Sequence, residues 1–277
     1  MSKILAAFMV PNSPYIIPEV GKNLAYNFSD LISAYEDIGE SIARLQPETI
    51  IFVSSQATMY SDYFHISPGN AAMGSLAEFD AVEIKHLEEY NIQLVNEISS
   101  IARTHRFPAG IMGEKDRFID FGTMVPLHFI RRHYRGGKIV KMGLSELSVQ
   151  DHYRMGQILQ LAVDRLGTKT IVVASANLSY RLEGSPYGFV AEAPVYNYKI
   201  MDICTRGAFD ELLSMDYDFC KRAGEGGHKA FLVMAGSMDG LNVNVMRHAT
   251  SAYAGAGYGI CAYLTGGVNY NRRFLSV

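Results

Sequence analysis

Residues 138–174 read KIVKMGLSELSVQDHYRMGQILQLAVDRLGTKTIVVA, and this stretch decides the fold. It begins and ends with short apolar runs rich in β-branched residues, at 138–142 and 170–174, which are typical of buried strands. Between them, residues 149–166 carry apolar side chains three and four positions apart, as in a helix that buries one face. A strand, a helix and a second strand in succession favour an α/β architecture.

The same alternation extends over the whole chain. Strands are also expected at 4–10 and 49–54 and as a final pair at 242–251 and 257–264, and helices at 21–45, 86–105, 123–134, 194–214 and 225–239. This order predicts a central, mainly parallel (mixed) sheet with helices on both faces. Because no repeat or Pro-, Gly- or Ser-rich linker separates two halves, we expect one domain over residues 1–277.

The composition is that of a folded globular protein. Of the 277 residues, 48% are hydrophobic and 19% are charged, so a sizeable core is expected. The net charge of -3 offers no basic surface for nucleic acid or an anionic membrane. The apolar stretches at 3–14 and 168–176 are shorter than the roughly 20 residues that span a bilayer. With no cleavage-site pattern at its start, the chain is predicted to be cytoplasmic.

Cysteine usage excludes two classes of site. The three cysteines, Cys204, Cys220 and Cys261, are odd in number and lack C-x-x-C spacing. This pattern argues against a disulfide framework and against a thiolate metal site. We interpret all three as reduced thiols.

The segments that follow the predicted strands are the candidates for a functional site. In open α/β sheets, ligands bind beyond the carboxyl ends of the strands. Here those segments read MVPNSPYIIPEVGK (9–22), SSQATMYSDYFHISPG (54–69) and ASANLSYRLEGSPYGF (174–189). Three further segments carry motifs, namely DFGTMVPLHFI (120–130), AGEGGHKAFLVMAGSMDG (223–240) and GAGYGICAY (255–263).

Together these segments resemble the LigB-type (class III) extradiol dioxygenase superfamily, and in particular the dioxygenase-like domain of AmmeMemoRadiSam system protein A. They follow the family's order over almost the whole chain. The resemblance implies a LigB-like fold and an Fe(II) site of two histidines and one glutamate. Such a facial triad leaves one side of the metal open for a catecholate and dioxygen.

Both histidine positions of that implied site carry other residues here. Asn12 stands where the family has the first histidine, in a V-P-H-P-P-like loop, and Gln56 stands where it has the second, in an S-P-H-A-like loop. Glu225 matches the glutamate. Neutral amides are poor ligands for a divalent transition metal compared with imidazole. The degenerate site Asn12, Gln56 and Glu225 is therefore expected to hold no metal and the protein to need no cofactor.

Positions implied to contact substrate and to move protons have changed as well. Phe121 replaces the histidine of the family's D-H-G-T segment, and Asn177 and Tyr180 replace the aspartate and the acid/base histidine of G-D-L-S-H-R. An unperturbed tyrosine, with a pKa near about 10, stays protonated at neutral pH, whereas imidazole titrates there. Asn12, Gln56, Phe121, Asn177 and Tyr180 are expected to line the pocket, with Tyr180 and Glu225 its candidate catalytic groups.

Other residues near these motifs have alternative interpretations. His65 is predicted to be a hydrogen-bonded structural residue rather than a ligand. Glu225 and His228, three apart on a predicted helix, could supply half of a relocated metal site, but no third ligand is evident. The remaining histidines show no ligand-like grouping. Five tyrosines could line a pocket for a planar aromatic ligand: Tyr15, Tyr60, Tyr63, Tyr180 and Tyr187.

Four functions remain open. The chain could be a non-catalytic subunit or partner of an active paralogue, which retained fold and replaced ligands would both predict. It could be an enzyme with iron-independent chemistry on a phenolic or cyclic carbonyl compound, with Glu225 as base and Tyr180 as acid. It could bind a small molecule without turnover, or remain a dioxygenase with an atypical metal site. A dimer or higher oligomer is expected in each case.

Overall fold

The computed structural model describes residues 2–113 and 118–275. Its strands form a central six-stranded sheet. The sheet order is β10-β11-β1-β9-β2-β8. The strands are β1 (Ile4–Val10), β2 (Thr49–Ser54), β8 (Lys138–Met142), β9 (Thr170–Ser175), β10 (Leu241–Tyr253) and β11 (Ala256–Val268). Strands β1, β9, β2 and β8 run parallel, whereas β11 is antiparallel to β1 and β10 to β11. The predicted mainly parallel, mixed sheet is confirmed.

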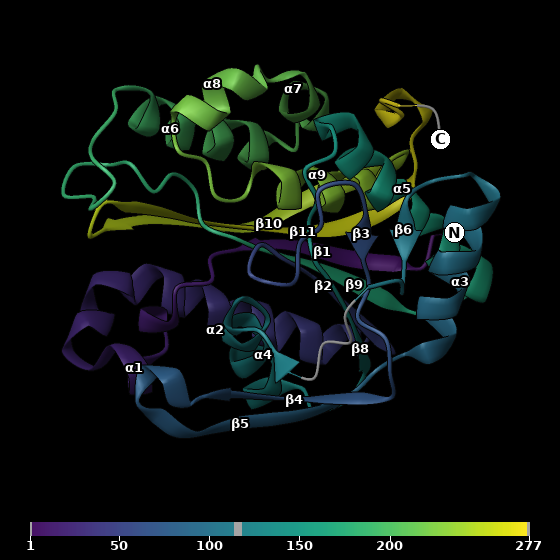
Figure 1. Cartoon of the computed structure of the whole chain (residues 1–277), viewed down its shortest axis with the longest axis horizontal. Helices are drawn as coiled ribbons and strands as arrows, with labels where there is room; N and C mark the ends of the chain where they lie inside the picture. The colour runs from purple at the N-terminus through teal and green to yellow at the C-terminus, as the bar shows by residue number, and fades with distance from the viewer. Residues whose placement is uncertain (1, 114–117, 276–277) are drawn as a thin grey trace.

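Helices cover both faces of this sheet (Figure 1). Alternate side chains of each strand enter different cores: Ile51 and Val53 of β2 pack in one, and Ile50 and Phe52 in the other. The first core is completed by α3 (Ile92–Thr104), α5 (Val149–Leu166), α6 (Glu192–Arg206) and α9 (His228–Ser237), and the second by α2 (Ser29–Leu45) and α4 (Phe121–His133). The predicted helices on both faces are therefore confirmed.

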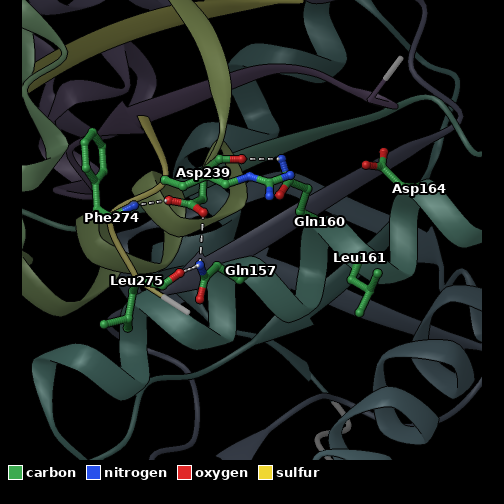
Figure 2. A pocket seen from close by; sticks show the side chains of 8 residues that line it. Gln157, Gln160, Leu161, Asp164, Asp239, Phe274 and Leu275 are labelled. Atoms are coloured by element: carbon green, nitrogen blue, oxygen red, sulfur yellow. Dashed lines mark hydrogen bonds between the residues drawn. The ribbon is translucent and has the colours of Figure 1, made fainter. Parts of the chain in front are cut away.

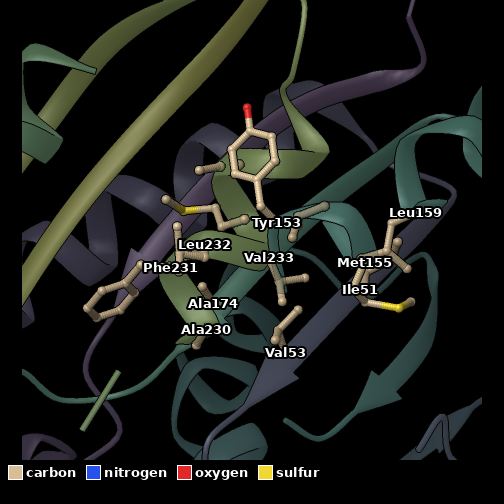
Figure 3. Packing of buried hydrophobic residues seen from close by; sticks show 14 of the residues in the cluster. Ile51, Val53, Tyr153, Met155, Leu159, Ala174, Ala230, Phe231, Leu232 and Val233 are labelled. Carbon is tan, nitrogen blue, oxygen red and sulfur yellow. The ribbon is translucent and has the colours of Figure 1, made fainter. Parts of the chain in front are cut away.

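Helices α5 and α9 pack closely above the sheet. Figure 3 shows Tyr153 of α5 beside Leu232 and Val233 of α9, with Val53 of β2 below them. A Cβ atom on Gly156 would lie 2.1 Å from the carbonyl oxygen of Val233. Because no side-chain carbon fits in that space, the glycine lets the two helix backbones touch. The position of α9, which begins at the candidate site, is fixed in this way.

Three predicted helices needed correction at their ends. Residues 21–45 are divided between α1 (Pro18–Gly21), a 3-10 helix at Lys22–Phe28 and α2. Residues 194–214 are divided between α6 and α7 (Phe209–Ser214), because Gly207 ends α6 in the left-handed region with φ 64°. Residues 225–239 contain only α9, so Glu225 lies before the helix rather than on it. A short helix, α8 (Tyr217–Arg222), was not predicted.

The prediction of a helix over residues 86–105 was wrong in its first third. Residues 81–89 form β5 (Ala81–Glu89), which pairs antiparallel with β4 (Ala71–Leu76), and β4 also pairs with β7 (Phe118–Ile119). The apolar spacing that includes Leu87 suggested a helix, yet this side chain is 77% exposed on the small sheet. Helix α3 starts only where the Asn91 side chain accepts a hydrogen bond from the Leu94 amide at 3.1 Å. Two further short strands, β3 (Phe64–His65) and β6 (Ala109–Gly110), pair in parallel.

The carboxyl-terminal segment is attached to the end of α9 by Asp239 (Figure 2). This carboxylate accepts hydrogen bonds from the hydroxyl of Tyr153 at 2.6 Å, Nε2 of Gln157 at 3.0 Å and the amide of Phe274 at 3.0 Å. The contacts join α5, the turn before β10 and the last described residues. Within the described ranges, no helix is both long and apolar enough to cross a membrane.

Candidate functional site

A pocket of about 1010 Å³ lies beyond the carboxyl ends of the parallel strands. Strands β1, β2 and β9 end at Val10, Ser54 and Ser175, each followed two residues later by a predicted site residue. All six predicted residues line this pocket: Asn12, Gln56, Phe121, Asn177, Tyr180 and Glu225. The structure thus brings together side chains from five separate segments. Three of these are the loops after β1, β2 and β9, which parallel strands deliver to one edge of the sheet.

Asn12 is buried, and hydrogen bonds within the protein fix both its side chain and its backbone amide. Its side chain is 1% exposed, and Nδ2 donates to Oγ of Ser55 at 3.1 Å and to the carbonyl oxygen of Ser175 at 3.2 Å. Its backbone amide donates to Oδ1 of Asn177 at 3.0 Å. The carbonyl partner fixes which end of the Asn12 amide is nitrogen, so Oδ1 is the acceptor that remains for the pocket. Asn12 connects the loops after β1, β2 and β9.

Gln56 is exposed, in contrast to Asn12. Its backbone amide donates to Oγ of Ser54 at 3.1 Å, and Oγ in turn donates to Oδ1 of Asp120 at 2.6 Å. A Cβ atom on Gly122 would lie 2.4 Å from that Oγ and 2.9 Å from the Gln56 side chain. Glycine at position 122 is therefore required for the start of α4 to approach the loop after β2.

Asp120 joins three segments behind the pocket. It caps α4 by accepting from the amide of Thr123 at 3.0 Å, and it lies 3.4 Å from Nζ of the buried Lys141. A buried cation is stable only when it is paired, which explains this arrangement. The next residue, Phe121, places its ring edge-on to Phe79 at 5.5 Å between centroids. Sequence reasoning missed Asp120, although the DFGT segment contains it.

Asn177 and Tyr180 form a hydrogen-bonded pair in the loop after β9. Nδ2 of Asn177 donates to the Tyr180 hydroxyl at 3.1 Å. Burial raises the pKa of Tyr180, and the Asn177 contact opposes that change only in part. The phenol is therefore protonated at neutral pH. Because its oxygen already accepts a hydrogen bond, its own proton is available for a partner elsewhere.

Glu225 lines the pocket from the turn before α9. Its carboxylate accepts from the Tyr217 hydroxyl at 3.1 Å and from the backbone amide of His228 at 2.7 Å. Burial raises the pKa of Glu225, while these two hydrogen bonds lower it. The amide contact lies at the amino end of α9, where a carboxylate is favoured by the helix dipole. Glu225 thus has a structural role at the helix start as well as a place in the pocket.

His228 does not share a helix face with Glu225, so that prediction was wrong. Glu225 precedes α9, whereas His228 is its first residue and is fully buried. Nδ1 of His228 lies 4.0 Å from Sγ of Cys220, and burial lowers the pKa of His228 to about 3. The imidazole is therefore neutral and is not among the side chains that line the pocket.

His65 has the surroundings of a structural residue. It is buried on β3, and its Nδ1 lies 3.0 Å from the carbonyl oxygen of Met112. It is not among the residues that line the pocket. The interpretation of His65 as a hydrogen-bonded structural side chain agrees with this position.

The donors around the pocket do not fit the family's iron site. Two of the three implied ligand positions offer amide groups, and one of these, Asn12, already donates two internal hydrogen bonds. In residues 2–113 and 118–275, no group of three or more His, Cys, Asp or Glu side chains is placed to hold a metal ion. A single carboxylate, Glu225, would have to replace two imidazoles and a carboxylate, which is a much weaker donor set for ferrous iron.

Aromatic side chains form much of the pocket wall. Of the five predicted tyrosines, Tyr15, Tyr180 and Tyr187 line it, whereas Tyr60 and Tyr63 line a separate hollow of about 670 Å³. Tyr253 and Tyr258 from the hairpin of β10 and β11 also line the main pocket. These two were missed, although Tyr258 lies in the GAGYGICAY segment, because nothing local shows that a carboxyl-terminal hairpin reaches this edge of the sheet.

Comparisons with known proteins agree with this architecture. The model of the family described as the catalytic LigB subunit of aromatic ring-opening dioxygenase matches residues 6–261. Protein CA_C1420 of Clostridium acetobutylicum is 29% identical over an alignment of 262 residues, which covers 91% of this chain and 56% of that protein. The chain thus spans little more than half of that relative's length. The crystal structure of uncharacterized protein JW3007 from Escherichia coli K12 is similar with a TM-score of 0.60 and 15% identity, over 93% of this chain and 99% of that one. This last similarity concerns the fold.

Proposed function

The chain belongs to the LigB family of aromatic ring-opening dioxygenase subunits, and we propose that it is a catalytically degenerate member without the ring-cleaving iron centre. Its expected role is that of a non-catalytic, cytoplasmic subunit or partner of an iron-bearing paralogue, in a dimer or larger assembly. Within the family, we place the chain nearest to the dioxygenase-like domain of AmmeMemoRadiSam system protein A. Residues 1–277 would form a single LigB-like domain in that assembly.

One observation carries this proposal, namely the state of the residues at the former ligand positions. Asn12 serves as an internal clamp between three loops, with its amide nitrogen bonded to Ser55 and Ser175. Glu225 accepts from Tyr217 and from the start of α9. These side chains now hold the loops in place, so the scaffold remains stable without a metal to organise it.

A second candidate function is favoured by the pocket itself. The pocket has not been filled by larger side chains, and its volume of about 1010 Å³ is that of a small-molecule site. Binding of a planar ligand, or iron-independent chemistry on it, would use this space. In the latter case Glu225, whose pKa is raised by burial, would exchange a proton with the ligand, and Tyr180 would donate to a carbonyl oxygen.

Oxygen uptake tests the loss of ring cleavage. The wild-type chain and an Asn12→His/Gln56→His double variant would each be loaded anaerobically with Fe(II) and mixed with catechol and dioxygen. We expect uptake no faster than the iron blank for the wild type. Circular dichroism of both chains would establish that they are folded. Catechol-dependent uptake by the wild-type chain, well above the blank, would refute the proposal.

Co-purification tests the partner role. Affinity-tagged chain expressed in its native cells should retain a homologue that carries both histidines and the glutamate. A chain recovered only as a homo-oligomer would contradict the partner role. That result would leave the second candidate function, ligand binding or altered chemistry, as the better account.

A further inference from the structure

The pocket has hydrogen-bonding groups that the protein does not use internally. Asn177 is engaged at both ends, because Oδ1 accepts from the Asn12 amide and Nδ2 donates to Tyr180. The Tyr180 hydroxyl therefore has a proton to donate, and Oδ1 of Asn12 remains as an acceptor. These two groups come from the loops after β9 and β1, and both residues are hydrogen-bonded to Asn177.

Gln56 has the least constrained polar side chain of this set. It is exposed and lines the pocket, and among the described residues its side chain makes one hydrogen bond, from Nε2 to Oγ of Ser55 at 3.5 Å. That distance is at the outer limit of a hydrogen bond, so the contact is weak. A carboxamide presents a donor and an acceptor side by side. Gln56 can therefore make two parallel hydrogen bonds to a ligand with the complementary pair.

The pocket walls suit a flat ring. Phe121, Tyr15, Tyr253 and Tyr258 contribute aromatic surface. Phe28 supports the two hairpin tyrosines, with edge-to-face contacts at 5.5 Å to Tyr253 and 5.3 Å to Tyr258. Rings that are held in this way provide stacking surface with little loss of side-chain entropy.

The charges in the pocket favour a neutral ligand. Apart from tyrosines, the ionisable side chains that line it are Arg181 and Glu225. Nε of Arg181 already donates to the carbonyl oxygen of Gly188 at 3.3 Å. The side chains of Arg181 and Glu225 are opposite in charge, so the lining has no excess of either sign to balance an ionic ligand, and a buried charge without a full set of partners is unfavourable. An uncharged ring avoids this cost.

On the basis of the iron-free pocket proposed above, we propose that this site binds an uncharged planar heterocycle with a cyclic amide edge. The ligand carbonyl accepts from Nε2 of Gln56, and the ligand N–H donates to Oε1. Tyr180 supplies a second donor to the carbonyl. Asn and Gln side chains recognise the donor-acceptor edge of adenine by the same two-bond geometry.

Calorimetric titration with matched probes tests this inference. Quinolin-2-one carries the cyclic amide edge, whereas 2-methoxyquinoline has the same ring without the N–H donor. Catechol and benzoate serve as phenolic and anionic probes. The chains compared are the wild type, Gln56→Glu, whose side chain has the same shape but no donor when ionised, and the control Gln93→Glu at an exposed position on α3.

We expect quinolin-2-one to bind the wild type and the Gln93→Glu control equally, and Gln56→Glu at least about tenfold more weakly, the effect of one lost hydrogen bond. The methoxy compound should bind all three chains at least about tenfold more weakly than quinolin-2-one binds the wild type. Equal affinity for the two quinolines, an unchanged Gln56→Glu affinity, tighter binding of catechol or benzoate, or no binding of any probe would overturn the inference. None of these outcomes depends on iron content or oxygen uptake, which test the proposed function separately.

Discussion

Helix α9 has a carboxylate near each of its ends, and the two serve different purposes. Glu225 lies three residues before the helix and accepts two hydrogen bonds, from Tyr217 and from the first amide of α9. Asp239 lies two residues after the helix and accepts three, from Tyr153, Gln157 and Phe274. A carboxylate is favoured by the helix dipole at the amino end and disfavoured at the carboxyl end. Asp239 is therefore held by these donors and by the charge of Arg272 rather than by the helix dipole, whereas Glu225 also lines the pocket.

The largest expected effect is at the carboxyl end of α9. Replacement Asp239→Ala leaves the hydroxyl of Tyr153 and the backbone N–H of Phe274 without their acceptor, and Nε2 of Gln157 keeps only its hydrogen bond to the carbonyl oxygen of Leu275. Each buried donor without a partner costs about 1 to 3 kcal/mol, so we expect a loss of roughly 3 kcal/mol or more in the free energy of unfolding. Urea denaturation measures it. A loss below about 1 kcal/mol would show that Asp239 does not anchor the carboxyl-terminal segment.

The next effect, near the amino end of α9, is a dependence of folding stability on pH. Burial lowers the pKa of His152, on α5, from an ordinary value of 6.5 to about 4. Its Nε2 accepts from the Ser145 amide at 3.3 Å and its Nδ1 lies 2.8 Å from the Ser148 carbonyl oxygen, so protonation would place two N–H groups against each other. The unfolded chain binds this proton more readily. Stability is therefore complete above about pH 6.5 and falls as the pH decreases toward 4.

Between pH 7.5 and pH 4.5 this single group should remove about 2 to 3 kcal/mol from the free energy of unfolding. The raised pKa of Glu225 acts in the opposite direction, because the folded state then binds its proton more readily than the unfolded chain. Comparison with His152→Gln isolates the histidine. The variant should show a shallower decrease in stability over this range. Parallel pH profiles for the two chains would exclude His152 as the titrating group.

A smaller effect is expected from steric contact within the pocket. A Cβ atom on Gly226 would lie 2.3 Å from the ring of Tyr180 and 3.0 Å from the Leu178 carbonyl oxygen. Gly226→Ala should therefore displace Tyr180 and cost about 1 to 3 kcal/mol. Gly267→Ala, where nothing lies within 4 Å, is the matched control and should change stability by less than about 0.5 kcal/mol. Equal thermal shifts in the two variants would contradict the close packing of the pocket wall.

The smallest effect completes the comparison of the two carboxylates. In Glu225→Gln, the side-chain oxygen can still accept from the backbone N–H of His228. The new side-chain NH2 group can donate to the hydroxyl of Tyr217. We expect a change of less than about 1 kcal/mol in urea denaturation at neutral pH. A loss as large as that of Asp239→Ala would mean that the charge of Glu225, and not only its acceptor oxygens, holds the start of α9.

Sequence patterns predicted the parallel strands of the central sheet well because these strands are buried on both faces. Strands β1, β2 and β8 have the predicted bounds, and α5 matches residues 149–166. The pattern failed where side chains are exposed. In β5, Leu87 and its neighbours satisfy a helical spacing, but pairing with β4 decides the structure there. A single-sequence pattern contains no information about a partner strand.

The candidate site, too, could be predicted only where local sequence decides the position of a residue. The positions of Asn12, Gln56 and Asn177 in one pocket followed from their places just after parallel strands. The sequence could not predict Tyr253 as a pocket residue, because only the packing of the hairpin against Phe28 brings it to the pocket. The error at His228 had a local cause. Residues 226 and 227 are glycines, and the helix begins only after them, so a spacing of three did not place both side chains on one turn.

Iron stoichiometry is the most direct test of the degenerate site. The wild-type chain would be equilibrated anaerobically with Fe(II) by dialysis, and the iron bound per chain would be measured by elemental analysis beside the Asn12→His/Gln56→His variant. With two amides and one carboxylate around the pocket, the wild type should hold far less than one iron per chain, and the double variant more. Close to one iron per wild-type chain, lost on Glu225→Ala, would contradict the account.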